Sequence, residues 1–270
     1  MTIFRGKKKR ALGLSLLLFT GLSSLQASEP ERLHIAVASN FKQTLEVLIT
    51  AFQSQAENAQ LQILSSSGSS GVLFAQITKG APYDVFLSAD AMRPDQLIEK
   101  GLALKHSRKV YAQGQIALWM PAYSASHEIA PLSIEVFAKG GQTYTLANPK
   151  LAPYGLAAKA LMQEAGWWKA KDRQRIMAQN IAGAFQYIAS GAVTLGWVAV
   201  AQLKAWEKQH ALLPTSYWLP DTLDYPAIEQ VAVRLKKSSK VSSAQSFFKF
   251  LSAPEAQSLI KSHGYLIPQQ

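Results

Sequence analysis

Short apolar runs alternate along this chain with stretches that have the hydrophobic spacing of amphipathic helices. Residues 33–38 (Leu-His-Ile-Ala-Val-Ala) form a run with the length of a buried strand. A helical face follows, with apolar residues at Leu45, Leu48, Ile49 and Phe52. Asn40 and Gln43 stand before this face in the order of a capping box, so the pattern predicts that a helix begins there.

The alternation continues to the C-terminus. Further strands are predicted at residues 61–64, 83–87, 115–120, 143–147, 193–200 and 228–233. Helices are predicted at residues 72–78, 155–165 and 181–190, after residues 88–90, and from Val241 to Leu251. The serine- and glycine-rich stretch 65–71 is predicted to be a loop. This order of elements predicts parallel sheets, an α/β fold and two lobes.

The first 27 residues have the order of a secretory signal. Five basic residues lie within positions 5–10, an apolar stretch covers 11–25, and small residues follow at Ala27 and Ser28. The apolar stretch is short for a membrane span, so we expect export and cleavage after Ala27. A retained membrane anchor is the alternative, because Leu25 is a poor residue at the third position before the cleavage point.

The composition excludes cysteine chemistry and disfavours nucleic acid as a partner. The chain has no cysteine, which excludes disulfides, thiolate metal sites and cysteine nucleophiles. Its net charge of +11 falls to +6 without residues 1–27, because 23 basic and 17 acidic residues remain. The densest basic cluster, residues 234–237, lacks the interleaved aromatic residues of a nucleic-acid groove. We therefore expect no nucleic-acid partner and a modest positive field that attracts small anions.

Motifs for catalysis are absent from the sequence. It contains no G-x-S-x-G elbow, phosphate loop or dinucleotide fingerprint, and its five histidines lack metal-ligand spacing. We expect neither an enzyme nor a direct metal ligand. A secreted serine hydrolase with Ser39 or Ser70 as nucleophile is the alternative from another class, and it requires a histidine beside that serine.

Small hydroxyl and glycine residues stand where predicted strands meet predicted helices. Ser39 follows the first strand, Ser69 and Ser70 precede a helix, and further helices open at 153–155 and 180–183. Helix N-termini present unpaired N–H groups and bind anions, and serine hydroxyls add donors without charge. If these ends converge across a cleft, they form a cage of neutral donors for a small oxyanion. Taken singly, Ser39 is also an ordinary helix cap and 65–71 an ordinary linker.

Several longer segments add a family resemblance. They are residues 36–39 (AVAS), 66–70 (SSGSS), 80–90 (GAPYDVFLSAD), 148–149, 153–155, 180–181, 195–198 (LGWV) and 224–226. In their order and spacing the chain, from residue 33 to 265, resembles the molybdate-binding proteins of bacterial ABC importers. That family has the two-lobed type II periplasmic substrate-binding fold. The resemblance implies that each lobe is a mixed, mostly parallel sheet flanked by helices, with the ligand in the interlobe cleft.

The resemblance also implies where the lobes and the signal segment lie. Residues 1–27 would be the signal peptide. Lobe I would comprise residues 28–112 and 224–270, and lobe II residues 113–223. A few hinge residues at the two crossings would let the lobes close around the ligand.

The resemblance assigns five residues to the oxyanion site. Ser39 and Ser70 would donate their hydroxyls, with Ser69 as the alternative to Ser70. Tyr154 and Ile181 would donate backbone N–H groups. The family often has a further tyrosine hydroxyl after the Leu-Gly-x-Val segment, and this chain has Ala199 there instead.

The implied protein is a periplasmic monomer that binds molybdate or tungstate and delivers it to an inner-membrane ABC permease. It would need no cofactor, and molybdenum would be bound only as the oxyanion. The alternative ligand within this class is another tetrahedral oxyanion, above all sulfate.

Overall fold

A computed structural model describes residues 1–2, 31–123, 132–135, 143–169 and 174–268. The predicted signal segment, residues 1–27, therefore lies almost wholly outside the described residues. Within the described ranges, no helix has the length and apolar character needed to cross a membrane.

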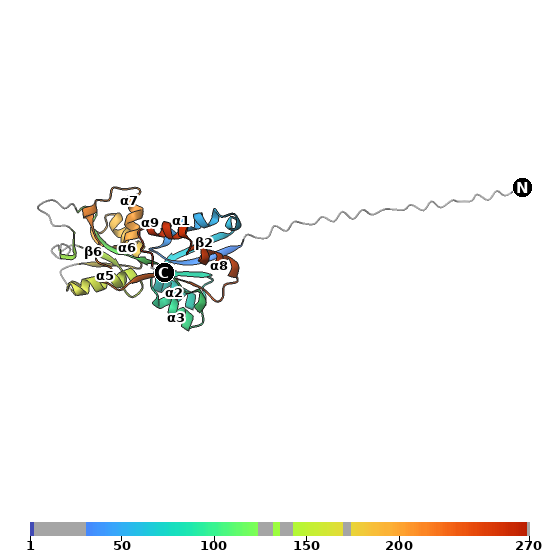
Figure 1. Cartoon of the computed structure of the whole chain (residues 1–270), viewed down its shortest axis with the longest axis horizontal. Coiled ribbons are helices and arrows are strands. Elements are labelled where there is room, and N and C mark those ends of the chain that lie inside the picture. Colours follow the sequence, from blue (N-terminus) through green and yellow to red (C-terminus); the bar gives the residue numbers. More distant parts are fainter. Residues whose placement is uncertain (3–30, 124–131, 136–142, 170–173, 269–270) are drawn as a thin grey trace.

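Segments from both ends of the chain form the first sheet (Figure 1). Its strands lie in the order β2-β1-β3-β10-β4, with the bounds Gln62–Gly68, Arg32–Ala38, Val85–Ser88, Ile228–Arg234 and Lys109–Gly114. Strand β1 is parallel to β2 and β3, whereas β10 is antiparallel to β3 and β4. The sheet is mixed because a C-terminal strand enters between two N-terminal ones.

The middle of the chain forms the second sheet. Its order is β7-β6-β8-β5-β9, with the bounds Arg175–Ala178, Tyr144–Ala147, Leu195–Ala199, Ile116–Trp119 and Tyr217–Trp218. Strand β6 is parallel to β7 and β8, and β5 is antiparallel to β8 and β9. We call the part around the first sheet lobe I and the part around the second lobe II. The predicted α/β fold with two lobes is confirmed.

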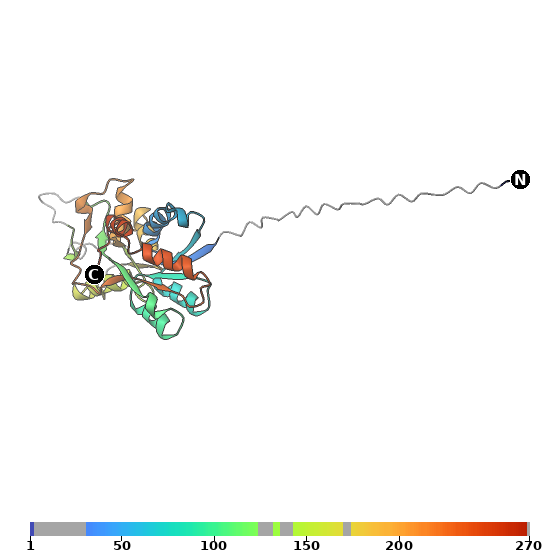
Figure 2. The same cartoon turned by 45° about the vertical axis from the view of Figure 1, so that its right-hand side comes forward.

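Helices cover both sheets (Figures 1 and 2). Lobe I has α1 (Lys42–Gln53), α2 (Ser70–Thr78), α3 (Met92–Glu99), α8 (Val241–Phe250) and α9 (Pro254–Ser262). Lobe II has α5 (Pro153–Glu164), α6 (Ile181–Ala189) and α7 (Val200–Glu207). Short 3-10 turns cover η1 (Ala56–Asn58), η2 (Lys105–Ser107) and η3 (Pro214–Ser216).

Strand β1 is buried on both faces. Leu33, Ile35 and Val37 belong to a core shared with α1 and α8, and Ala36 belongs to a core on the other face with α2 and α3. A strand covered on both sides needs no polar alternation, which explains its continuous apolar run.

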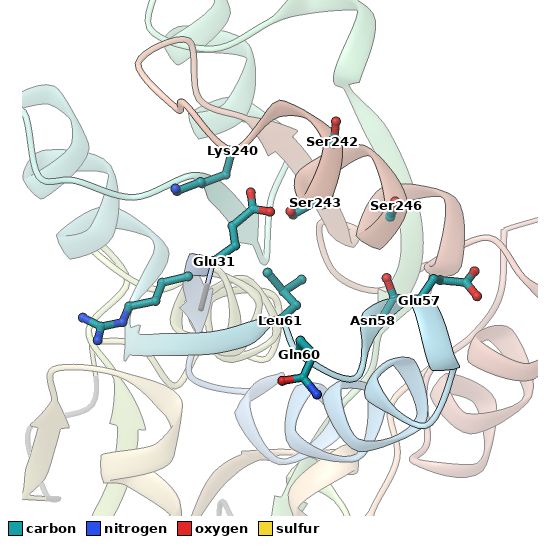
Figure 3. Close-up of a pocket in the computed structure, with 10 residues that line it drawn as sticks. Glu31, Glu57, Asn58, Gln60, Leu61, Lys240, Ser242, Ser243 and Ser246 are labelled. Carbon is teal, nitrogen blue, oxygen red and sulfur yellow. The ribbon is translucent and has the colours of Figure 1, made fainter. Parts of the chain in front are cut away.

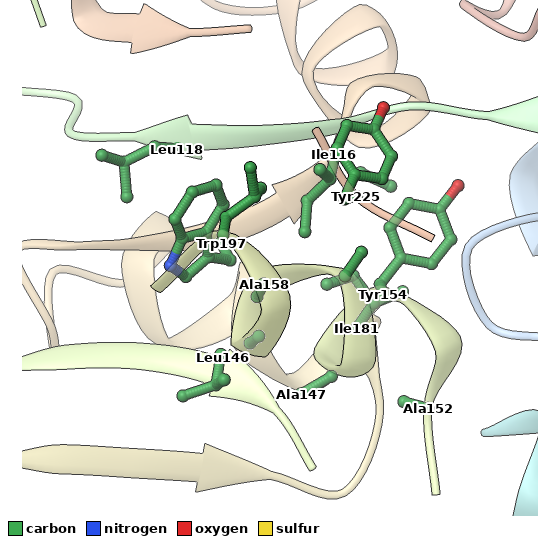
Figure 4. Close-up of a cluster of buried hydrophobic side chains, with 14 of the residues drawn as sticks. Ile116, Leu118, Leu146, Ala147, Ala152, Tyr154, Ala158, Ile181, Trp197 and Tyr225 are labelled. Carbon is green, nitrogen blue, oxygen red and sulfur yellow. The ribbon is translucent and has the colours of Figure 1, made fainter. Parts of the chain in front are cut away.

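The core of lobe II includes Leu118, Leu146 and Trp197 (Figure 4), and the same cluster takes in Ala38, Ala89 and Ile228 of lobe I. Tyr154 and Tyr225 lie at one end of it, with their hydroxyls directed away from the apolar cluster. Each lobe thus has a core built mainly from its own elements, and a few apolar residues join the two lobes.

The chain passes between the lobes over few residues. Strand β4 of lobe I ends at Gly114, and β5 of lobe II begins at Ile116. The return path covers residues 219–227, between β9 and β10. Backbone hydrogen bonds of 2.8 and 2.9 Å join Gln113 to Leu266 beside the first crossing.

Two local predictions were wrong. Helix α1 has Phe41 at its N-cap and no side-chain cap, because the Asn40 side chain bonds to distant residues instead of to the helix. Strand β2 extends to Gly68, although residues 65–71 were predicted to be a loop. Pairing with β1 along seven residues holds this polar segment extended.

Candidate functional site

One small cavity lies between the lobes, where β1 and β2 end and helices α2, α5 and α6 begin. It is lined by Ala38, Ser39, Asn40, Gly68, Ser69, Ser70, Ala89, Ala152, Pro153, Tyr154 and Ile181. All five predicted site residues are among them. The structure therefore brings these five residues together from four separate segments of the chain, and Ala89 comes from a fifth.

The cavity is small and uncharged. None of its lining residues carries a charge at neutral pH. Its volume is about 10 Å³, far below the roughly 300–1,000 Å³ of sites for drug-sized ligands. Three helices begin at it, and their N-termini carry partial positive charge. The cavity therefore suits a small anion held by dipoles.

Ser39 is the first residue after β1. Its backbone N–H donates to the carbonyl oxygen of Gly68 at 2.9 Å, which joins the ends of β1 and β2. This N–H is occupied, so Ser39 can offer only its hydroxyl. No hydrogen bond from a described residue engages that hydroxyl, and the residue is partly exposed. The hydroxyl is therefore available to a ligand.

Ser69 and Ser70 stand at the start of α2. Ser69 is the N-cap, and its Oγ accepts from the N–H of Val72 at 3.4 Å. Ser70 is fully buried, and its Oγ accepts from the N–H of Ala89 at 3.0 Å. That bond occupies a lone pair of the oxygen, so the Ser70 hydroxyl donates its hydrogen in another direction. Ser69 has the ordinary use of a cap, which favours Ser70 as the donor to a ligand.

Tyr154 and Ile181 lie in the first turns of α5 and α6, where N–H groups have no partner within the helix. Pro153 has no N–H, so Tyr154 is the first residue of α5 with one to donate. In α6, Asn180 caps the helix by accepting from the N–H of Gly183 at 3.0 Å, which leaves the N–H of Ile181 available.

Asn40 also lines the cavity, although the sequence pattern predicted only a capping role for it. Its Nδ2 donates to Gln230 Oε1 at 2.8 Å and to Tyr265 Oη at 3.1 Å. The Tyr265 hydroxyl in turn donates to the Asn40 carbonyl at 2.9 Å. These partners are about 200 residues away along the chain, so no local signal could have revealed them.

Ala199, where the resemblance led us to expect a tyrosine, has no side-chain donor. Its backbone N–H donates to Gln202 Oε1 at 2.9 Å, and Gln202 Nε2 donates to the Ile181 carbonyl at 3.2 Å. The buried Gln202 therefore links the start of α7 to the Ile181 peptide at the cavity. No sequence motif marks Gln202 as a site residue.

Buried tyrosines surround the first crossing. Burial raises the pKa of Tyr154 well above its ordinary value, neighbouring tyrosines raise it further, and the Asn40 side chain offsets part of the rise. Burial likewise raises the pKa of Tyr111 and Tyr265. Among the described residues, the Tyr111 and Tyr154 hydroxyls have no hydrogen-bond partner. These phenols add no negative charge beside the cavity at neutral pH.

A larger hollow lies in lobe I between η1 and the start of α8 (Figure 3). Its charged lining residues are Glu31, Arg32, Glu57 and Lys240, and no predicted site residue is among them. The two carboxylates balance the two cations, so the hollow has no net charge that favours an anion. It also lies within lobe I, where closure of the lobes does not enclose a ligand.

The hydrolase alternative requires a histidine beside Ser39 or Ser70. Within the described ranges, no histidine hydrogen-bonds to either serine. The pair that does form is His34 Nε2 with Ser66 Oγ at 2.9 Å, outside the cavity. Asp84 accepts from the backbone N–H of His34, so it does not orient the ring as a triad acid does.

Residues 33–266 match the model of a family described as bacterial extracellular solute-binding protein. The chain belongs to this family, whose match covers both lobes and the cavity between them.

Within this family, the chain is similar to proteins named as molybdate-binding proteins. The chain is 34% identical to the molybdate-binding protein ModA of Rhodobacter capsulatus over 257 residues, 95% of this chain and 96% of that protein. It is 33% identical to ModA of Azotobacter vinelandii over 242 residues, 88% of this chain and 91% of that protein. The solved periplasmic molybdate-binding protein of Azotobacter vinelandii superimposes with a TM-score of 0.77 at 36% identity, covering 88% of this chain and all of that one. The predicted family and fold are confirmed.

Proposed function

We propose that this chain is a periplasmic substrate-binding protein that captures molybdate or tungstate and delivers it to an inner-membrane ABC importer. The observation that carries this proposal is the uncharged interlobe cavity, at which the hydroxyls of Ser39 and Ser70 meet the N-termini of three helices. The relatives named as molybdate-binding proteins support the choice of anion.

The donor set explains how a neutral site holds a dianion. Each O–H or N–H replaces a water molecule of the anion, and hydrogen bonds to a charged acceptor are the stronger ones. A protonated oxyanion brings an O–H that finds no acceptor among donors and is buried unpaired. The site therefore selects fully ionised tetrahedral anions over monohydrogen phosphate. Selection between molybdate and sulfate depends on the size of the closed cavity.

Binding by lobe closure needs a hinge and no covalent chemistry. We assign residues 28–112 and 224–270 to lobe I and residues 113–223 to lobe II, with hinge residues at the two crossings. Gln113 and Gly114, which still pair with β10 in the first sheet, belong to the first hinge. The protein acts as a monomer without a cofactor, and molybdenum is bound only as the oxyanion. Residues 1–27 direct export and are removed after Ala27. Mass spectrometry of the exported protein tests this, because a retained anchor leaves residues 1–27 in place.

The decisive experiment compares anions. Purified mature protein is titrated with molybdate, tungstate, sulfate, phosphate and chromate while its melting temperature is measured. Molybdate and tungstate should stabilise it, by about 2.7 kcal/mol at a hundredfold excess over the dissociation constant. Stabilisation by sulfate alone would overturn the substrate assignment in favour of a sulfate-binding protein.

A serine hydrolase makes a different prediction. It would cleave ester substrates, and alanine at one of the five histidines would abolish this activity. A histidine-to-alanine series that leaves oxyanion binding intact, together with no ester hydrolysis by the parent, removes this alternative.

A further inference from the structure

Lobe I contacts lobe II through Arg93, a residue outside the oxyanion cavity. Arg93 lies in the first turn of α3 and is only 8% exposed. Its Nη1 is paired with the carboxylate of Asp90 in the same lobe. Its Nη2 donates to the backbone carbonyl of Lys150 in lobe II at 3.3 Å. One guanidinium therefore joins an acid of its own lobe to a peptide of the other.

Gly71 makes a second contact with the same segment of lobe II. Its backbone N–H, in the first turn of α2, donates to the Leu151 carbonyl at 2.9 Å. A β-carbon at Gly71 would lie 2.9 Å from that oxygen, 3.1 Å from Leu151 Cα and 3.0 Å from Arg93 Nη2. The lobes meet this closely only because residue 71 has no side chain.

These contacts adjoin the proposed anion donors on both sides. Gly71 follows Ser70 in the chain, and Lys150 and Leu151 precede the cavity residues that begin at Ala152. Neither Arg93 nor Gly71 lines the cavity itself. The contacts can therefore hold the lobes together around an anion without touching it.

We propose that Arg93 and Gly71 form a latch that holds the lobes closed and sets how long a bound oxyanion stays in the cavity. The proposal rests on the proposed function for its ligand. In an open molecule Arg93 keeps its bond to Asp90, while the carbonyls of Lys150 and Leu151 turn to water. The latch bonds thus exist only in the closed state, and losing them speeds opening without weakening lobe I.

Arg93→Lys tests the guanidinium. Lysine can still pair with Asp90, but its single ammonium lacks the planar fork that reaches both the carboxylate and the Lys150 carbonyl. The matched control is Arg108→Lys. Arg108 pairs with Asp95 inside lobe I, with Nε 2.6 Å from Oδ1, and makes no hydrogen bond to the described residues of lobe II.

Gly71→Ala tests the close approach. Alanine is a better helix former than glycine, so the variant should keep or raise the stability of ligand-free lobe I. Its β-carbon should nevertheless prevent α2 of lobe I from approaching Leu151 of lobe II. A loss of binding together with undiminished stability separates the latch from a general packing role.

The measurements are molybdate affinity by calorimetry and its dissociation rate by stopped flow. Arg93→Lys and Gly71→Ala should each release molybdate about tenfold faster with a nearly unchanged association rate, and Arg108→Lys should match the parent. X-ray scattering should give both latch variants a larger radius of gyration with molybdate present. Parental dissociation rates in both latch variants would overturn the latch.

Failure of the proposed function would look different. A parent that binds none of the five anions contradicts that function whatever Arg93 does. The latch is then judged by scattering of the ligand-free protein, in which the two variants must still be more extended than the parent and the Arg108→Lys control. Equal radii would overturn it.

Discussion

A β-carbon placed on Gly114 would lie 2.2 Å from the Tyr154 hydroxyl oxygen. Gly114 is the last residue of β4, at the first crossing, and Tyr154 belongs to the turn of α5 in lobe II that opens on the interlobe cavity. The phenol of lobe II therefore fills the space that the missing side chain of Gly114 leaves at the crossing. A change at the crossing is transmitted directly to a wall of the cavity.

Gly114→Ala should displace the Tyr154 ring and lower the free energy of unfolding by about 1–3 kcal/mol, as overpacking does. Tyr154→Phe removes the nearest atom of the clash. In the double variant, part of the loss should be recovered, with a coupling free energy of about 0.5–3 kcal/mol. Urea unfolding of the parent, both single variants and the double variant measures it.

Tyr225→Phe is the matched control for this cycle, because Tyr225 is also a buried tyrosine of the same apolar cluster and is not among the closest neighbours of a β-carbon at residue 114. Gly114→Ala and Tyr225→Phe should be additive. If the changes in the free energy of unfolding for Gly114→Ala and Tyr154→Phe also add, the two residues are not coupled. Tyr154 would then move away from the new β-carbon without loss of stability.

The hydroxyls of Ser39 and Ser70 carry the second prediction. Ser39→Ala and Ser70→Ala should each weaken molybdate binding by about 1.5–3 kcal/mol, the contribution of a hydrogen bond to a charged group. Ser70→Ala should also lower stability without ligand, because it leaves the N–H of Ala89 unpaired. Calorimetry and thermal unfolding separate the two effects. Ser67→Ala, at an exposed position of β2, is the control.

Parental affinity in both Ser39→Ala and Ser70→Ala would contradict their assignment as donors. Weakening by Ser69→Ala alone would move the assignment to Ser69, which the resemblance left open.

Gln202 gives a third prediction because it holds the carbonyl of Ile181 in the first turn of α6. Gln202→Leu keeps the approximate volume and removes both hydrogen bonds, so the start of α6, which presents the Ile181 N–H to the cavity, is held less firmly. Molybdate affinity should fall by about 1 kcal/mol, the contribution of one neutral hydrogen bond. Gln186→Leu, at an exposed glutamine of α6, should leave the affinity unchanged. Equal affinities for the two variants would remove Gln202 from the site.

Periodicity predicted most of the elements that form the two cores. The run at residues 33–38 and the helical face that follows are β1 and α1. Strands β4, β7 and β9 and helices α7 and α9 were not predicted from the sequence. Strand β4 contains Lys109 and Gln113 and takes its conformation from pairing with β10, which lies far along the chain. Such non-local pairing leaves little trace in a local pattern.

The candidate site, like the fold, could be predicted only in part. The serines and the helix starts could be located where predicted strands meet predicted helices, but nothing in the composition places residues 39, 70, 154 and 181 around one cavity. The family resemblance supplied that convergence, and the structure shows it. Asn40 and Gln202 could not be identified because their roles consist of hydrogen bonds to residues in other elements. Long-range polar contacts of this kind require coordinates.

The fourth prediction concerns alkaline pH. Burial raises the pKa of Tyr111 in the folded protein, so the unfolded chain releases this proton at lower pH than the folded one. The contribution to stability is complete below the unfolded pKa, about 10, and is lost as pH rises from there toward the folded value. Each such tyrosine lowers the free energy of unfolding by up to about 1.4 kcal/mol per pH unit in that window.

Tyr111→Phe removes one of these groups and a buried hydroxyl that has no partner among the described residues. At pH 7 the variant should therefore be as stable as the parent or more stable. Above pH 10 its stability should fall less steeply than that of the parent, measured by urea unfolding at a series of pH values. Tyr187→Phe, at a 41% exposed position, should follow the parent throughout. Parallel curves for Tyr111→Phe and the parent would mean that Tyr111 ionises as easily in the folded protein as in the unfolded chain. That result would contradict the prediction that burial raises the pKa of Tyr111.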